Sequence, residues 1–213
     1  MSLESMSKKT GYLLMLLVFL LGLVFGAHSV HHPVSSSPKV IGKSVNPTHR
    51  QILSPALFNL KGQIATLAQG TQGTVVLAMA PWCSFCAYED RWVLPQMVSA
   101  NRVIAVDVVD VSYLGGIASP GPEYPPFHGL DAQGSTRTEA SARAVMRQYI
   151  EHLHIVHTGL HFYVMAPQER AQWSHQPVPQ WYVLNSKGAL VAHYEGALTA
   201  QQATTWIEEL LKP

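Results

Sequence analysis

After about residue 47, apolar and polar positions divide the chain into short continuous apolar runs and longer amphipathic segments. The runs GTVVLAMA (73–80) and RVIAVDVVDV (102–111) are rich in β-branched residues, which is typical of strands buried on both faces of a sheet. Three further segments predict strands, with a hairpin turn of sequence Asn-Ser-Lys-Gly between the last two: 161–165, 180–184 and 189–194.

Amphipathic segments predict three helices. The first covers 84–94, and Pro95 should kink or end it because proline lacks the amide proton. Two capping-box patterns open the other helices: Thr136 with Glu139, and Thr199 with Gln202. Behind these patterns, apolar residues recur at helical spacing: Ala142, Val145, Met146, Tyr149, Ile150 and Leu153, then Ala203, Trp206, Ile207, Leu210 and Leu211. Strands separated by helices and closed by a hairpin predict an α/β fold with a central mixed β-sheet flanked by helices.

The N-terminal region contains a long apolar segment without charge. Residues 11–27, GYLLMLLVFLLGLVFGA, would span about 25 Å as a helix, the short end of a membrane span. We interpret the segment as a transmembrane anchor or uncleaved signal; the alternative is a signal peptide cleaved after Gly26 or Ser29. A buried core helix is disfavoured because no face of the segment is polar. Lys8 and Lys9 keep the N-terminus on the cytoplasmic side, so the rest of the chain is exported in either case.

These patterns divide the chain into four parts. Residues 1–10 form a cytoplasmic N-terminus, 11–27 the anchor, 28–46 a flexible tether rich in Ser, Pro and His, and 47–213 one folded domain. The expected location is the cytoplasmic (inner) membrane, crossed once, with the domain in a periplasmic or other extracytoplasmic space. Cleavage of the signal would make the protein secreted.

Composition excludes several classes of function. Lys and Arg total 14 against 13 Asp and Glu, so the chain lacks the basic excess of a nucleic-acid binder. Charged residues make up 13% and hydrophobic residues 47%, which argues against a disordered chain. Two cysteines are too few for a disulfide scaffold or an all-cysteine zinc site.

The two cysteines form a CxxC motif, Trp82-Cys83-Ser84-Phe85-Cys86, between a predicted strand and a predicted helix. This placement puts the first sulfur at the helix N-terminus, where unpaired amides and the helix dipole favour a thiolate. We therefore expect Cys83 to be the nucleophile and Cys86, one turn later and more buried, to resolve the mixed disulfide. Half of a zinc site and an inert disulfide are the alternatives. The first lacks a second cysteine pair, and a bridge over so short a loop stabilises a fold least.

With an apolar N-terminal segment followed by a strand, a CxxC motif and a helix, the sequence resembles the thioredoxin superfamily. Within that superfamily it resembles the membrane-anchored TlpA-like and ResA-like thiol-disulfide oxidoreductases. The resemblance covers about 58–212 and rests on these residues: Phe58-Asn59-Leu60-Lys61-Gly62, the CxxC motif, Glu89, Val178-Pro179, Lys187-Gly188 and Glu195-Gly196. It implies a thioredoxin-like domain over 47–213.

The resemblance also implies roles for single residues. Pro179 matches the family's cis-proline beside the CxxC motif, and with Val178 it would pair with an extended substrate segment; an ordinary trans proline is the alternative. Glu89 matches a family glutamate near the second cysteine and would accept a proton during resolution, unless it is a solvated helix residue. Trp82 would shield the disulfide, although packing alone also accounts for a tryptophan.

Two features depart from the family pattern. No proline stands between the cysteines, so the usual cues to redox potential are missing. Residues 113–135 form a Gly- and Pro-rich insertion longer than a typical connection. It is either a functional lid or a mobile insertion, and we favour a role in partner recognition.

Two classes of function remain. The first is a membrane-tethered thiol-disulfide oxidoreductase that needs no cofactor beyond its own Cys83–Cys86 disulfide. Its partners would be client proteins with thiols or disulfides and a membrane or periplasmic redox partner. The second is a Cu(I)-binding, metallochaperone-like protein using the same cysteines. The chain has 11 histidines, but His154, His157, His161 and His193 have no placement that forces them near Cys83, so no metal site is assigned.

Overall fold

The computed structural model describes residues 54–100, 104–155, 158–173 and 177–212, with the side chains of 171–173 left undescribed. The predicted cytoplasmic segment, anchor and tether, and the first residues of the predicted domain, lie outside this range. Within the described residues, no helix combines the length and hydropathy that a membrane span requires.

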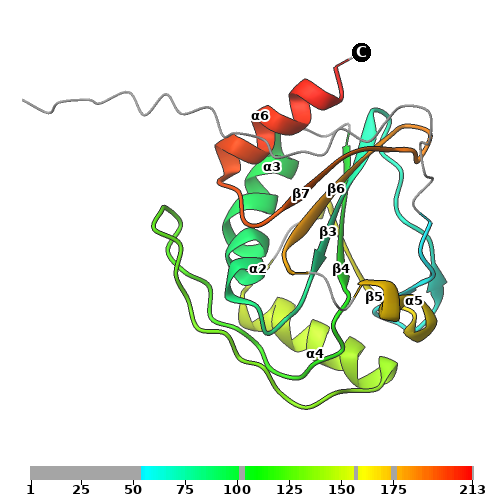
Figure 1. Cartoon of the computed structure of the whole chain (residues 1–213), viewed down its shortest axis with the longest axis vertical. Helices are drawn as coiled ribbons and strands as arrows, with labels where there is room; N and C mark the ends of the chain where they lie inside the picture. Colours follow the sequence, from blue (N-terminus) through cyan, green and yellow to red (C-terminus); the bar gives the residue numbers. More distant parts are fainter. Residues whose placement is uncertain (1–53, 101–103, 156–157, 174–176, 213) are drawn as a thin grey trace, which may run out of the picture. The chain divides into compact units, whose positions relative to one another are not determined.

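The described strands form a seven-stranded sheet in the order β2-β1-β5-β4-β3-β6-β7 (Figure 1). Strands β3, β4 and β5 are parallel, whereas β6 pairs antiparallel with β3 and the outer strands continue antiparallel. The bounds are β1 (Leu57–Asn59), β2 (Ile64–Ala65), β3 (Gly73–Met79), β4 (Ile104–Asp110), β5 (Leu160–Met165), β6 (Gln180–Asn185) and β7 (Leu190–Glu195). The predicted mixed sheet of an α/β fold is confirmed.

The helices are α2 (Ser84–Tyr88), the π-helical segment η2 (Glu89–Val93), α3 (Leu94–Ala100), α4 (Glu139–His152), α5 (Pro167–Trp173) and α6 (Ala200–Leu210). The connections β3 to β4 and β4 to β5 step across the sheet in the same direction. Parallel crossovers are right-handed, so their helices fall on one face of the sheet.

Burial confirms this arrangement of the helices. On one face, Leu77 of β3 shares a core with Met97 of α3, Met146 of α4 and Ile207 of α6. On the other face, alternate residues of the same strands, such as Val76, form a second and smaller cluster. The central strands are therefore buried on both faces, which explains their continuous apolar runs.

The helix after the cysteines is longer than predicted. It does not end at Pro95 but continues as α3 to Ala100. The π-helical turn η2 precedes the proline, and Leu94 donates its backbone amide to the carbonyl of Glu89. Pro95 therefore lies directly after the π-helical turn, inside a continuous helical segment that it does not end.

The N-cap of α4 also differs from the prediction. Thr138, not Thr136, accepts the amide of Ser141 and begins the helix at Glu139. Thr136 instead forms an isolated antiparallel bridge with Leu114. The capping box of α6, Thr199 with Gln202, is present as predicted. Strands β1 and β2 and helix α5 were not predicted, because such short elements leave no readable periodicity.

Candidate active site

The cysteines lie where the carboxyl end of β3 passes into α2. The turn that joins β3 to α2 is closed by a hydrogen bond from the Cys83 amide to the carbonyl of Ala80, at 3.0 Å. Cys83 has extended backbone angles and is the N-cap of α2, and its Sγ accepts the amide of Cys86 at 3.2 Å. The sulfur therefore takes the place that a serine or aspartate oxygen usually fills at a helix N-terminus.

The two thiols differ in acidity. The hydrogen bond with the Cys86 thiol, the largest effect, lowers the pKa of Cys83 despite the opposing effect of burial, and the amide of Cys86 adds to the lowering. Burial raises the pKa of Cys86 well above its ordinary value, and the neighbouring Cys83 raises it further. Both cysteines are free thiols, so the structure shows the reduced pair. The direction of the difference matches a Cys83 nucleophile and a Cys86 resolving thiol.

Cys83 is less exposed than expected for a nucleophile. Cys83 is 4% exposed and Cys86 is 0% exposed, so the predicted order of burial holds, but both residues are inside the protein. The Cys83 thiol donates a hydrogen bond to the carbonyl oxygen of Val178 at 3.7 Å. The segment that carries Pro179 therefore covers the sulfur.

Pro179 is preceded by a cis peptide bond, as the family resemblance implied. Its ring is buried and Val178 is half-buried, directly before β6. The Val178 carbonyl faces the sulfur of Cys83. The proposed role of both residues in substrate binding stays a prediction.

Glu89 is not a solvated helix residue. It is fully buried at the start of η2, where its Oε1 accepts the indole N–H of Trp181 at 2.8 Å and the amide of Leu198 at 2.9 Å. Its Oε2 has no hydrogen-bond partner among the described residues. Burial raises the pKa of Glu89 well above its ordinary value, and the charge of Cys83 contributes in the same direction. The carboxyl is therefore electrostatically coupled to the cysteines.

A second buried acid, Asp90, was not predicted. Its Oδ2 accepts the hydroxyl of Tyr149 at 2.5 Å, and burial raises its pKa to about 7. Burial also raises the pKa of Tyr149 well above its usual range, with further contributions from Asp90 and Cys86. Since Asp90 and Tyr149 lie 59 positions apart in the chain, no local sequence signal could have paired them.

Trp82 is half-buried and held from the side of β4. Its indole N–H donates to the hydroxyl of Ser112 at 3.2 Å, and Ser112 in turn donates to Asp110. Arg137 lies 3.6 Å from the buried Asp110, which closes this chain of polar contacts. The contacts orient Trp82 beside Cys83; its proposed shielding of a disulfide stays a prediction.

The predicted insertion over 113–135 contacts the active-site loop directly. Figure 1 shows two extended segments running side by side, and antiparallel bridges join Leu114 to Thr136 and Ser119 to Leu130. The ring of Phe127 packs against Tyr88 of α2 with centroids 4.1 Å apart. The described insertion therefore packs against the helix that carries Cys86.

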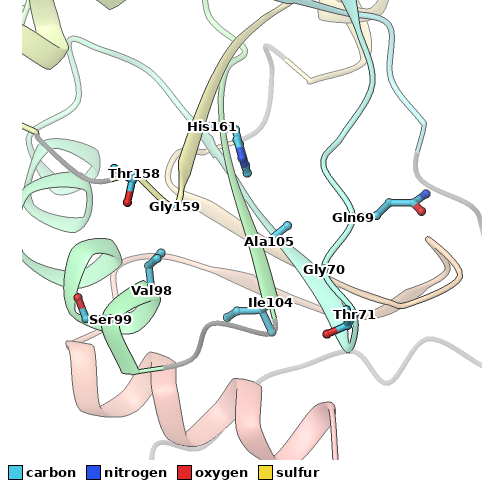
Figure 2. Close-up of a pocket in the computed structure, with 10 residues that line it drawn as sticks. All are labelled: Gln69, Gly70, Thr71, Val98, Ser99, Ile104, Ala105, Thr158, Gly159 and His161. Carbon is cyan, nitrogen blue, oxygen red and sulfur yellow. The ribbon is translucent and has the colours of Figure 1, made fainter.

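A pocket of about 690 Å³ lies at the opposite end of the sheet (Figure 2). It is lined at the amino ends of the parallel strands by residues that include Gly70, Ile104 and His161. His161 contacts the buried Asp107 with its Nδ1 3.1 Å from Oδ1. This pocket is remote from the carboxyl ends where the cysteines lie, and we assign it no ligand.

Of the four histidines considered above, those that the structure describes lie on different elements of the fold. Helix α4 ends at His152, and His154 has a backbone φ of 52°. His161 lies on β5 and His193 stacks on Tyr182, whereas His157 lies outside the described residues. The described part of the chain holds no group of three His, Cys, Asp or Glu side chains placed to bind a metal.

No protein-family profile matches the chain, and no curated protein is significantly similar to it in sequence. Solved structures do share its fold. A DsbF homologue from Corynebacterium diphtheriae has a TM-score of 0.51 and 16% identity, covering 84% of this chain and 97% of its own. A thioredoxin-like protein from Aeropyrum pernix has a TM-score of 0.51 and 13% identity, with coverages of 73% and 89%. An uncharacterised conserved protein from Geobacillus kaustophilus reaches 0.53 at 14% identity, with coverages of 81% and 86%.

These similarities establish the class of fold. The described domain is a thioredoxin-like α/β domain with a CxxC motif at the N-terminus of the helix that follows its central strand. The fold predicted from the resemblance is confirmed.

Proposed function

We propose that the protein is a thiol-disulfide oxidoreductase that exchanges disulfides with client proteins through Cys83 and Cys86. The observation that carries the proposal is the N-cap position of Cys83, whose sulfur accepts the Cys86 amide and has a lowered pKa. The fold shared with a DsbF homologue supports the same class of chemistry.

The reaction transfers two electrons from the dithiol to the client. The Cys83 thiolate attacks one sulfur of a client disulfide, and the other client sulfur leaves as a thiolate. Cys86 then loses its proton and attacks the sulfur of Cys83, which releases the second client thiol and leaves a Cys83–Cys86 disulfide. The reverse sequence oxidises a client dithiol. The direction depends on the potentials of the partners.

Glu89 is the proposed proton acceptor for Cys86. Burial raises the pKa of both groups, so the proton is accepted by the ionised form of Glu89, which its raised pKa makes a stronger base than an ordinary carboxylate. Its Oε2, free of hydrogen bonds within the described residues, is the atom available for the proton.

Val178 and Pro179 form the proposed docking edge for the client. The Val178 carbonyl lies 3.7 Å from the Cys83 sulfur, so an extended client segment pairing there would bring its cysteine to the nucleophile. The apolar segment 11–27 behind Lys8 and Lys9 supports a membrane tether with the domain on the extracytoplasmic side. A membrane or periplasmic redox partner would then restore the starting state.

The test uses the purified full chain in detergent with a protein disulfide substrate. Cys83→Ser should abolish reduction of the substrate, because the thiolate that starts the reaction is lost. Cys86→Ser should instead accumulate a covalent mixed disulfide with the substrate, visible by non-reducing electrophoresis. Full activity of Cys83→Ser would refute the proposal.

A further inference from the structure

The insertion is attached to the cysteine loop by three hydrogen bonds. The amide of Ala118 donates to the carbonyl of Pro81 at 2.8 Å, and the amide of Ala132 donates to the carbonyl of Trp82 at 2.9 Å. In the third, the amide of Ser84 donates to Oδ1 of Asp131 at 2.7 Å. The contacts therefore reach both sides of Cys83.

Asp131 and Cys83 bind amides of the same helical turn. Ser84 is the first residue of α2, and the first amides of a helix have no partner within the helix. Asp131 takes the amide of Ser84, while the Cys83 sulfur takes the amide of Cys86. The positive end of the helix dipole favours negative charge, and two acidic side chains share it here.

We propose, on the basis of the proposed function, that Asp131 is a positioning residue whose charge opposes the Cys83 thiolate and makes the Cys83–Cys86 couple a weaker oxidant. A stabilised thiolate stabilises the reduced form and raises the reduction potential, so a nearby anion acts in the opposite direction. The insertion thereby lowers the reduction potential of the site, an effect that Ser84 and Phe85 between the cysteines do not predict.

The effect of Asp131 on the pKa of Cys83 has the direction that the proposal requires. Among the effects on the pKa of Cys83, the hydrogen bond with the Cys86 thiol is the largest and lowers it, whereas the charge of Asp131 raises it. The other ionisable groups coupled to Cys83 are Glu89 on η2 and Tyr149 on α4, both fully buried. Asp131 is exposed, so its charge can be removed without disturbing the core.

The test compares the full chain with its Asp131→Asn variant. Asparagine keeps an oxygen that accepts the Ser84 amide and removes only the charge. The ultraviolet absorbance of the Cys83 thiolate should appear at lower pH in the variant. Equilibration with glutathione should shift at least about threefold toward the reduced protein, equal to about 14 mV for this two-electron couple.

Two further variants show whether the effect comes from the charge of Asp131. Asp131→Ser also offers an oxygen acceptor without charge and should shift both measurements in the same direction. Glu123→Gln removes a charge from the same insertion, where Glu123 accepts from Gln96 on α3, and should leave both measurements unchanged. High salt should reduce the shift caused by Asp131→Asn, because salt screens an exposed charge.

Unchanged acidity and potential in Asp131→Asn would overturn the inference, as would an equal shift in Glu123→Gln. The proposed function is judged separately, by reduction of a protein disulfide by the unaltered chain. A chain without that activity whose Asp131→Asn variant still shifts would contradict the function and uphold the electrostatic role of Asp131.

Discussion

Two adjacent acidic residues, Glu89 and Asp90, are fully buried immediately after the cysteine helix but face different neighbours. Glu89 accepts from Trp181 and is coupled to Cys83, whereas Asp90 accepts from Tyr149. Burial raises the pKa of both, which alone does not indicate a role in chemistry. The coupling to the cysteines is the reason that Glu89, and not Asp90, is the proposed proton acceptor.

Replacing these two acids gives a matched test. Glu89→Gln keeps an oxygen for Trp181 and Leu198 but cannot take a proton, so turnover at neutral pH should fall by about tenfold or more. The pH dependence of the step that releases the client should flatten. The measurement is steady-state reduction of a protein disulfide between pH 5 and pH 9.

Asp90→Asn is the control, because it also removes a buried carboxyl and keeps an oxygen for Tyr149. Its turnover should stay within about threefold of that of the unaltered protein. A threefold change in rate corresponds to less than half of the activation free energy of a tenfold change. Equal losses in the two variants would show that Glu89 acts through the fold and not through proton transfer.

Some residues of the site are predictable from the sequence and others are not. Cys83 and Cys86 stand in a local motif whose chemistry depends on spacing, whereas the role expected of Pro179 came from the family resemblance. Asp131 has no motif, since its contact with Ser84 spans 47 positions and depends on how the insertion folds back. A Gly- and Pro-rich sequence predicts turns but does not specify which residue returns to the site.

At the scale of elements, the helix after the cysteines shows how a local rule can be correct and still misplace an end. Pro95 does lack an amide, but it lies directly after the π-helical turn η2, inside a continuous helical segment that it does not end. The same turn carries Glu89 and Asp90. The extra residue of a π turn changes the direction of neighbouring side chains, and such turns are frequent at functional sites.

The N-cap of α4 gives a prediction at this scale. Thr138→Ala should destabilise the protein by about 1 kcal/mol, because the amide of Ser141 loses its side-chain acceptor. Thr136→Ala should change stability by less than about 0.5 kcal/mol, because exposed positions away from caps and cores are tolerant. Urea unfolding of the two variants, followed by circular dichroism, measures the difference. A larger loss in Thr136→Ala would place the helix start at the capping box that the sequence suggests.

At the scale of the whole described domain, the alternation of buried strands and amphipathic helices was sufficient to predict the α/β class and the mixed sheet. The order of strands was not predictable from that pattern. β5 adds beside β4, whereas β6 adds beside β3, on the other side of the parallel strands. An apolar run buried on both faces carries no information about its neighbours.

The described domain also buries acidic side chains, which makes the stability of the protein depend on pH. Burial raises the pKa of Asp90 on η2 to about 7, and it raises that of Asp107 on β4 to about 7 as well. In the unfolded chain an aspartate ionises near pH 4. Between these pH values the unfolded chain loses protons that the folded protein keeps. The contribution of the two carboxyl groups to the free energy of unfolding is therefore complete below about pH 4 and is lost as the pH rises through 7.

We therefore expect the reduced protein to unfold at lower urea concentration at pH 7 than at pH 5. Asp90→Asn, neutral at every pH and still able to accept from Tyr149, should remove its share of this dependence, about 2 kcal/mol between the two pH values for one fully buried carboxyl. The measurement is urea unfolding of both proteins at several pH values with the thiols kept reduced. If the unaltered protein were as stable at pH 7 as at pH 5, or if Asp90→Asn kept the full dependence, Asp90 would be ionised within the fold and its contact with Tyr149 would join a charged oxygen to a hydroxyl.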